Sequence, residues 1–197
     1  MVLPIYTYGQ PILRQRATPV AGDSLELQQL IDDMVETMLG ATGVGLAAPQ
    51  VGQSVRVFTV DLAPFADDLA AENGGVVPPF ALGPFALINP VAEPMPDAED
   101  EGYEEGCLSM PDIRETVIRP TRIRLHYLDR AFVPQETVAS GMFARVAQHE
   151  IDHLDGVLFT DHLSALRRRL LQRRLRAMAR GEVDAEYPVA PAEMRAG

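Results

Sequence analysis

The chain has 197 residues, of which 47% are hydrophobic and 23% are charged, a composition typical of one soluble globular domain with a substantial core. It contains no run of about eighteen apolar residues and no basic segment followed by an apolar core at its start, so we expect neither a membrane span nor a secretory signal. The single cysteine excludes an internal disulfide and fits a reducing cytoplasm, and the net charge of −11 argues against general DNA binding.

Residues 23–40 predict the first helix. Asp23 and Glu26 have the spacing of a capping box at its start, and Gly40 suits its end. Between them, apolar side chains recur with the period of one helical face. This stripe consists of Leu27, Leu30, Ile31, Met34, Val35, Met38 and Leu39.

The middle of the chain predicts strands separated by a long connection. Residues 55–60 are rich in β-branched side chains and predict a strand. Residues 62–84 contain paired acids, glycines and prolines, which predict a surface excursion. Residues 85–89 and 116–129 predict two further strands, with Pro120 at an edge or a bulge.

The last third of the chain predicts two helices and a tail. The first covers residues 140–154, and the second runs over residues 164–180 with Ser164 as its N-cap. Residues 181–197 are polar and lack periodicity, so we expect a flexible tail there. The chain then forms a single catalytic domain over residues 1–180.

The most informative segment is H-E-I-D-H at residues 149–153. In a helix, His149 and His153 occupy positions i and i+4 on one face, where two imidazoles can hold one metal ion. Glu150 beside them can handle the proton of a metal-activated water molecule. An accidental match is uncommon because histidine is rare, and only 4 histidines occur in the chain.

A third protein ligand is needed, and the usual places do not supply it. One class of zinc peptidase has a third histidine six residues after the second, but that position is Phe159. Another class takes a glutamate from a later helix, and the downstream glutamates all fall in the expected tail: Glu182, Glu186 and Glu193. His162 follows no recognised spacing. Cys107 is a strong alternative because a thiolate binds divalent transition metals well, although a lone cysteine is more often a small buried apolar residue.

A second unusual segment reads G-V-G-L-A-A-P-Q at residues 43–50. Two glycines around a small apolar residue let the backbone approach another group closely. Gln50 is a neutral hydrogen-bond donor that can stabilise an oxyanion. By itself, the segment is more typical of a glycine-rich turn between a helix and a strand than of a functional site.

Three segments together resemble the motifs of the peptide deformylase family, in the order that the family has them. They are G-V-G-L-A-A-P-Q at 43–50, E-G-C-L-S at 105–109 and Q-H-E-I-D-H-L-D-G at 148–156. The flanking segments are also similar to the family, so the resemblance covers residues 1 to about 180. The main departure is the stretch 62–84, which is longer than in the compact bacterial form.

The resemblance implies an α+β fold in which small mixed or antiparallel sheets wrap around a central metal-binding helix, with helices near both ends. It implies a cytoplasmic hydrolase that removes the N-formyl group from the N-terminal formylmethionine of newly synthesised proteins and releases formate. Fe²⁺ is the expected cofactor, and Zn²⁺, Ni²⁺ or Co²⁺ are alternatives.

Site roles follow from the same resemblance. Cys107, His149 and His153 would bind the metal, and Glu150 would be the general base and acid for the metal-bound water that attacks the formyl carbon. Gln50 and the backbone N–H of Leu108 would hold the oxyanion, with Gly45 close to the formyl group. The peptide substrate would lie extended along the cleft, and the residues expected to contact it are Val44, Gly45, Gly106, Leu108 and Val146.

Other classes of protein remain as alternatives. A general zinc endopeptidase shares H-E-x-x-H, but its third ligand is missing from the expected positions. A structural metal site needs a fourth protein ligand, for which His162 is a candidate. A catalytically inactive relative is disfavoured because Glu150, Gln50 and all three ligands are intact.

The last predicted helix is strongly basic on an otherwise acidic chain. Its arginines are Arg167, Arg168, Arg169, Arg173, Arg174, Arg176 and Arg180. The apolar stripe opposite them consists of Leu166, Leu170, Leu171, Leu175 and Met178. A basic face of this kind is often just a solvated surface. The family resemblance instead favours docking onto ribosomal RNA, near the emerging nascent chain.

Overall fold

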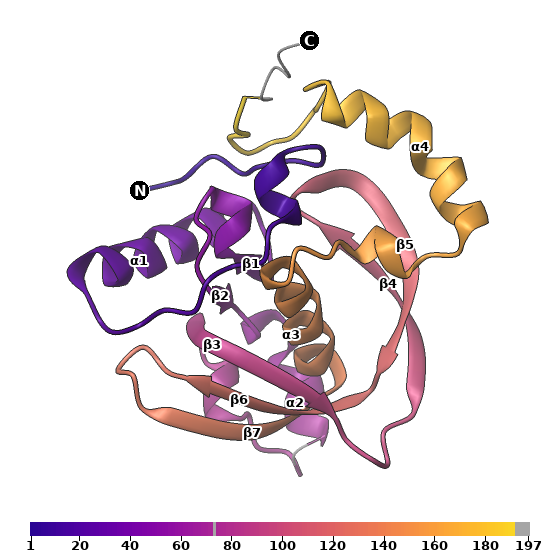
Figure 1. Ribbon diagram of the computed structural model, residues 1–197. Helices are drawn as coiled ribbons and strands as arrows, with labels where there is room; N and C mark the ends of the chain where they lie inside the picture. The colour runs from indigo at the N-terminus through magenta and orange to yellow at the C-terminus, as the bar shows by residue number, and fades with distance from the viewer. Residues whose placement is uncertain (73, 192–197) are drawn as a thin grey trace.

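In the computed structural model, which describes residues 1–72 and 74–191, two antiparallel sheets surround the helix α3 (Gly141–Leu154) (Figure 1). The larger sheet has the strand order β1-β2-β3-β6-β7, and the smaller one is the hairpin β4-β5. All pairings between these strands are antiparallel. The predicted α+β class with small sheets around a central helix is therefore confirmed.

The remaining elements have the following bounds. The strands are β1 (Gly45–Ala47), β2 (Val57–Val60), β3 (Phe85–Pro94), β4 (Asp100–Cys107), β5 (Met110–Pro120), β6 (Arg122–Leu128) and β7 (Pro134–Ser140). The other helices are α1 (Leu25–Gly40), α2 (Ala66–Glu72) and α4 (Ala165–Ala179), and the short 3-10 turns are η1 (Pro11–Arg14), η2 (Ala48–Val51), η3 (Ala63–Phe65), η4 (Pro79–Ala81) and η5 (Phe159–His162). No helix within the described ranges is long and apolar enough to cross a membrane.

Helix α3 is held by its apolar face against the larger sheet. Phe143 and Ala147 on this helix share a buried cluster with Phe58 of β2 and Leu125 of β6. The prediction of a helix over residues 140–154 is confirmed to within one residue. The apolar face fixes the rotation of α3 about its axis, and that rotation decides where its polar residues point.

Helix α1 confirms the predicted span but not the predicted cap. Ser24, not Asp23, is the N-cap, and its side chain accepts a hydrogen bond from the Leu27 N–H. The apolar stripe is buried at its centre, whereas Leu39 at one end is 46% exposed. Asp23 instead accepts a hydrogen bond from the side chain of Gln28 at 2.7 Å.

The strand predictions are correct for β2 and for the first half of β3, but they missed the short buried strand β1 and are incomplete elsewhere. Strands β2 and β3 were expected, but residues 116–129 form two strands because the chain turns at Thr121 after Pro120. Strands β4 and β7 were not predicted. Both are mostly exposed and polar, so they lack the apolar alternation that signals a strand.

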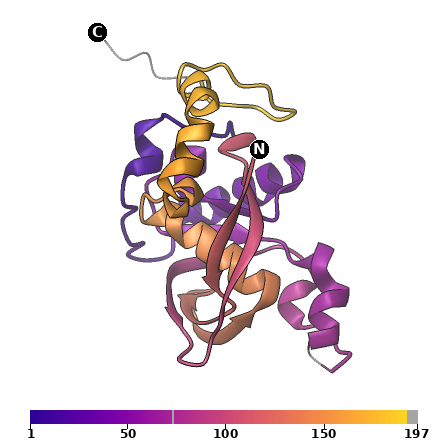
Figure 2. The same ribbon diagram turned by 90° about the vertical axis from the view of Figure 1, so that its right-hand side faces the viewer.

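The excursion over residues 62–84 projects from one side of the molecule (Figure 2), but it is not only surface. Leu69 of α2 and Ala81 are 5% and 2% exposed and belong to the same cluster as α3. The ring of Phe80 lies 5.0 Å from that of Phe143. The prediction of a plain surface excursion is therefore wrong for these side chains, which extend the main core.

The last helix confirms the prediction in span and cap. Helix α4 begins after Ser164, whose side chain accepts a hydrogen bond from the Arg167 N–H. Its predicted apolar stripe is only half correct. Leu171, Leu175 and Met178 are buried, whereas Leu166 and Leu170 are 68% and 66% exposed.

Residues 181–191 include a segment that packs against the N-terminal part of the chain, contrary to this part of the predicted tail over 181–197. The N–H of Ile5 donates to Pro188 O at 2.8 Å, and the N–H of Ala190 donates to Ile5 O at 2.9 Å. Ala190 is buried. The segments around Ile5 and Ala190 thus lie side by side, as the N-terminal stretch of chain and the yellow segment in Figure 1 show. Residues 192–197 of the predicted tail lie outside the described residues.

We predict that Gly156→Ala destabilises the protein. Gly156 follows α3 with φ +74, and a Cβ there would lie 2.8 Å from the backbone of Arg14. Left-handed backbone alone costs about 1–2 kcal/mol for other residues, and the overlap adds to it. Urea unfolding measures the loss. Gly22→Ala is the control because a Cβ there would meet nothing within 4 Å; equal free energies of unfolding for the two variants would contradict this account.

Candidate metal centre and active site

Three candidate ligands from distant parts of the chain meet beside α3. His149 and His153 lie one turn apart on this helix, and Cys107 ends strand β4. Their ligand atoms all lie within 4.8 Å of one another, and Cys107 Sγ is 3.1 Å from His153 Nε2. Among the described residues, this is the one group of three such side chains that fits a metal ion, and His162 does not belong to it.

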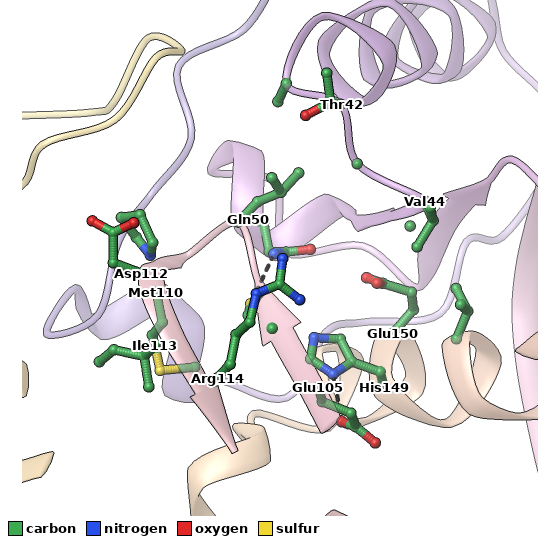
Figure 3. A pocket seen from close by; sticks show the side chains of 18 of the residues that line it. Thr42, Val44, Gln50, Glu105, Met110, Asp112, Ile113, Arg114, His149 and Glu150 are labelled. Atoms are coloured by element: carbon green, nitrogen blue, oxygen red, sulfur yellow. Dashed lines mark hydrogen bonds and ion pairs between the residues drawn. The ribbon is translucent and has the colours of Figure 1, made fainter. Parts of the chain in front are cut away.

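A buried carboxylate holds His149 in place. Glu105 Oε2 lies 3.0 Å from His149 Nδ1, as the dashed line in Figure 3 shows. Glu105 also accepts two hydrogen bonds from Arg119, at 2.7 and 3.0 Å, and one from Arg145 at 3.2 Å. Burial alone would raise the pKa of Glu105, but His149 and Arg119 outweigh it and lower the pKa to about 2. Nδ1 of His149 therefore carries a proton, and Nε2 can bind a metal.

Cys107 and His149 strongly influence each other's ionisation. Burial opposes ionisation of the Cys107 thiol, but the neighbouring His153 and His149 outweigh it and lower its pKa to about 5. Burial also opposes the charge on His149, and hydrogen bonds with Cys107 and Glu105 instead raise its pKa. Cys107 is therefore a thiolate at neutral pH, the form that binds transition metals. Two imidazoles and one thiolate fit a divalent transition metal ion.

Gln50 is fixed in one orientation by its own backbone turn. Its Oε1 accepts a hydrogen bond from the Ala47 N–H at 2.8 Å, so its NH₂ group faces the other way. This group donates to Ser109 Oγ at 3.1 Å and lies 3.5 Å from Cys107 Sγ. The donor is thus held at the edge of the three-ligand group.

Glu150 is buried next to the ligands and lacks a full set of partners. Its side chain faces the cleft beside His149 (Figure 3), and no hydrogen-bond partner of its Oε2 is found in the described part of the chain. Burial raises its pKa to about 7, against the opposing effect of His149 and His153. A carboxylate with that pKa can both accept and return a proton at neutral pH.

Gly45 leaves the space that the Glu150 carboxylate occupies. A Cβ on Gly45 would overlap that carboxylate and would lie 2.9 Å from Val146 Cγ1. Gly43 has a similar relation to Leu108, because its Cβ would lie 2.7 Å from Leu108 Cδ1. The glycines of the first motif thus leave room for side chains of the other two motifs.

These groups open into a cleft of about 970 Å³. The five residues predicted to contact substrate all line it: Val44, Gly45, Gly106, Leu108 and Val146. Sequence reasoning missed Glu105, Arg119 and Arg145, because no local pattern pairs an acid with bases 14 and 40 residues away. It also missed the segment 184–187, which lines the mouth of the cleft after α4.

Comparisons with known proteins agree with this site. The family model of polypeptide deformylase matches residues 2–169. A peptide deformylase of Salinibacter ruber is 55% identical over 190 residues, which cover 96% of this chain and 94% of that protein. A peptide deformylase of Flavobacterium johnsoniae is 43% identical, with coverage of 95% and 94%.

Solved structures show the same architecture. The crystal structure of a peptide deformylase from Ehrlichia chaffeensis has a TM-score of 0.79 at 33% identity, and the match covers 92% of this chain and 99% of that one. A peptide deformylase from Legionella pneumophila has a TM-score of 0.76 at 35% identity, with coverage of 92% and 98%. The sequence and the fold of this chain match peptide deformylases over nearly their full length. The chain therefore belongs to the peptide deformylase family and is an enzyme of that class.

Proposed function

We propose that this enzyme removes the N-formyl group from the N-terminal formylmethionine of newly synthesised proteins and releases formate. The observation that carries the proposal is the buried Glu150 carboxylate, which has an unpartnered oxygen and adjoins a thiolate and two imidazoles. A purely structural metal site would have no use for such a group. The lone free thiol agrees with a cytoplasmic location, where formylated chains are made.

Cys107, His149 and His153 would hold one divalent transition metal ion. Fe²⁺ is the ion we expect from the family, and Zn²⁺, Ni²⁺ and Co²⁺ suit the same donors. The chemistry that such an ion supplies is activation of a water molecule and polarisation of a carbonyl oxygen. Three protein ligands leave room in the coordination sphere, as catalytic sites require.

The protein's own groups would manage the proton and the developing charge. Glu150 would take the proton of the attacking water and return it to the departing amine, a task suited to a pKa of about 7. Negative charge would collect on the formyl oxygen, where the NH₂ group of Gln50 and the N–H of Leu108 would donate hydrogen bonds. One such donor is worth about 2.7–4 kcal/mol in other enzymes.

The peptide would bind as an added strand in the cleft. Strand β4 pairs only with β5 among the described strands, so its other edge can pair with an extended substrate near Gly106. Val44 would pair from the opposite side. The methionine side chain would then lie against Val44, Val146 and His149, which all line the cleft.

We predict that Glu150→Gln abolishes formate release without preventing metal binding. The amide keeps the shape of the carboxylate but cannot transfer the proton, and general acid–base catalysis contributes about 10²–10⁴-fold. Formate release from formyl-Met peptides, measured after anaerobic purification, is the assay. Glu93→Gln, an exposed acid on β3, is the control.

Two outcomes would contradict the proposed function. A metal-loaded wild-type enzyme that releases no formate would overturn it. Cleavage of an unformylated peptide at an internal bond would favour the zinc endopeptidase instead.

We predict that Glu105→Gln weakens metal binding by about 10–100-fold, the usual effect of removing a group that orients a ligating histidine. Titration with Zn²⁺ or Co²⁺ against a competing chelator measures the affinity, and circular dichroism verifies folding. Glu104→Gln is a matched control because Glu104 is the preceding residue and is exposed. Equal affinities of the Glu105→Gln variant and the wild type would show that Glu105 does not orient His149.

We also propose that α4 docks onto ribosomal RNA. Residues 165–180 contain no acidic residue, although the whole chain has a net charge of −11. Arg167 and Arg174 are engaged by Glu115 and by the carbonyl of Asp112. Three arginines of the same helix are exposed: Arg168, Arg169 and Arg173. Their charges would contact the RNA phosphates. Leu166 and Leu170 are exposed beside them.

We predict that reversing these three exposed charges reduces ribosome co-sedimentation by about tenfold or more at low salt. The test variant combines Arg168→Glu, Arg169→Glu and Arg173→Glu. The control has the same net charge but changes arginines away from α4: Arg16→Glu, Arg122→Glu and Arg124→Glu. Co-sedimentation that is equal in the two variants would sink the docking proposal, while formate release tests the active site separately.

A further inference from the structure

The turn between β4 and β5 is held by residues from the N-terminal and the C-terminal parts of the chain. This turn consists of Leu108 and Ser109. The carbonyl of Ser109 accepts a hydrogen bond from the Tyr8 N–H at 2.9 Å. The carbonyl of Leu108 accepts one from the Tyr187 hydroxyl at 2.7 Å. The two carbonyls of the turn are thus bound by an N-terminal and a C-terminal residue.

Tyr187 is itself fixed by the segment that carries it. Pro188 O and the Ala190 N–H on its C-terminal side bond with the backbone of Ile5, which is fully buried. Gln10 Nε2 donates to Ala190 O at 3.3 Å. The side chain of Tyr187 packs against the apolar cluster that contains Ile5. These contacts hold residues 183–190 in place, and this segment positions the Tyr187 hydroxyl.

The clamped turn joins the parts of the proposed site. Cys107 precedes it directly, the Leu108 N–H lies within it, and the Ser109 hydroxyl accepts a hydrogen bond from Gln50. A displacement of this turn would move Cys107 and the Leu108 N–H together and would disturb the hydrogen bond between Gln50 and Ser109. Misplacement of catalytic groups by about 1 Å can cost a large part of the rate.

We propose that residues 183–190 clamp the catalytic turn and that Tyr187 is a positioning residue for the Leu108 donor. This inference rests on the proposed function for its effect on turnover. The family model ends at residue 169, so nothing in that match assigns a role to this segment. Tyr187 lines the cleft and acts through the Leu108 carbonyl, to which its hydroxyl donates.

The test removes only the hydroxyl. Tyr187→Phe keeps the ring packing, so we expect KM to stay within about twofold while kcat falls about three- to tenfold, the range for one lost hydrogen bond of ordinary strength. The melting temperature should fall by about 1–6 °C, as expected for one lost hydrogen bond in a chain of this size. Tyr127→Phe, on β6 and outside the cleft, is the control and should match the wild type.

A second readout is independent of turnover. In the Tyr187→Phe variant, backbone amides of residues 107–110 should exchange with deuterium about three- to tenfold faster than in the wild type, because the turn has lost one restraint. The amides of α3 should be unchanged. If wild-type enzyme releases no formate, the proposed function fails, and the exchange rates alone decide whether the clamp exists.

Either of two results overturns the proposal. One is a kcat of the Tyr187→Phe variant equal to that of the wild type, or reduced only in proportion to the unfolded fraction. The other is unchanged amide exchange at residues 107–110. Both would mean that the Tyr187 hydroxyl merely anchors the C-terminal segment.

Discussion

The buried carboxylate of Glu105 joins the two halves of the active site. Glu105 and Cys107 are two residues apart at the end of β4, where the register with β5 shifts between Gly106 and Cys107. Because Glu105 bonds to His149, the thiol two residues later is brought to the same helix, 3.1 Å from His153. A single buried acid thereby sets the position of the hairpin against α3.

A charge can occupy that position only because other charges compensate it. An isolated buried carboxylate would cost several kcal/mol, and Arg119 and Arg145 repay this by direct hydrogen bonds. Arg119 also binds Asp152 at 2.8 Å, and Asp152 binds His162 at 2.7 Å. His162, a candidate fourth ligand from the sequence, therefore belongs to the outer end of this network.

Secondary structure was predictable where periodicity and caps coincide. Helices α1, α3 and α4 follow from their apolar stripes or caps, strand β2 from its β-branched residues, and the first half of β3 from its apolar run. Strand β4 was missed because one face is exposed and acidic, and the segment after α4 because its partner, Ile5, lies at the other end of the chain. The N-cap of α1 is Ser24 and not Asp23. Both residue types are good N-caps, so the sequence does not distinguish them; the backbone conformation before the helix does.

For the site, the sequence by itself determined which side chains are present: the H-E-x-x-H spacing, the lone thiol, and glycines where no Cβ fits. Helical geometry makes the pairing of His149 and His153 a local property, which is why it can be read from five residues. Only the tertiary structure decided that Cys107 completes the group, that Glu105 orients His149, and that Tyr187 reaches the Leu108 carbonyl. These contacts join residues far apart in the chain, and their geometry depends on how α3, the hairpin and the two chain ends pack together.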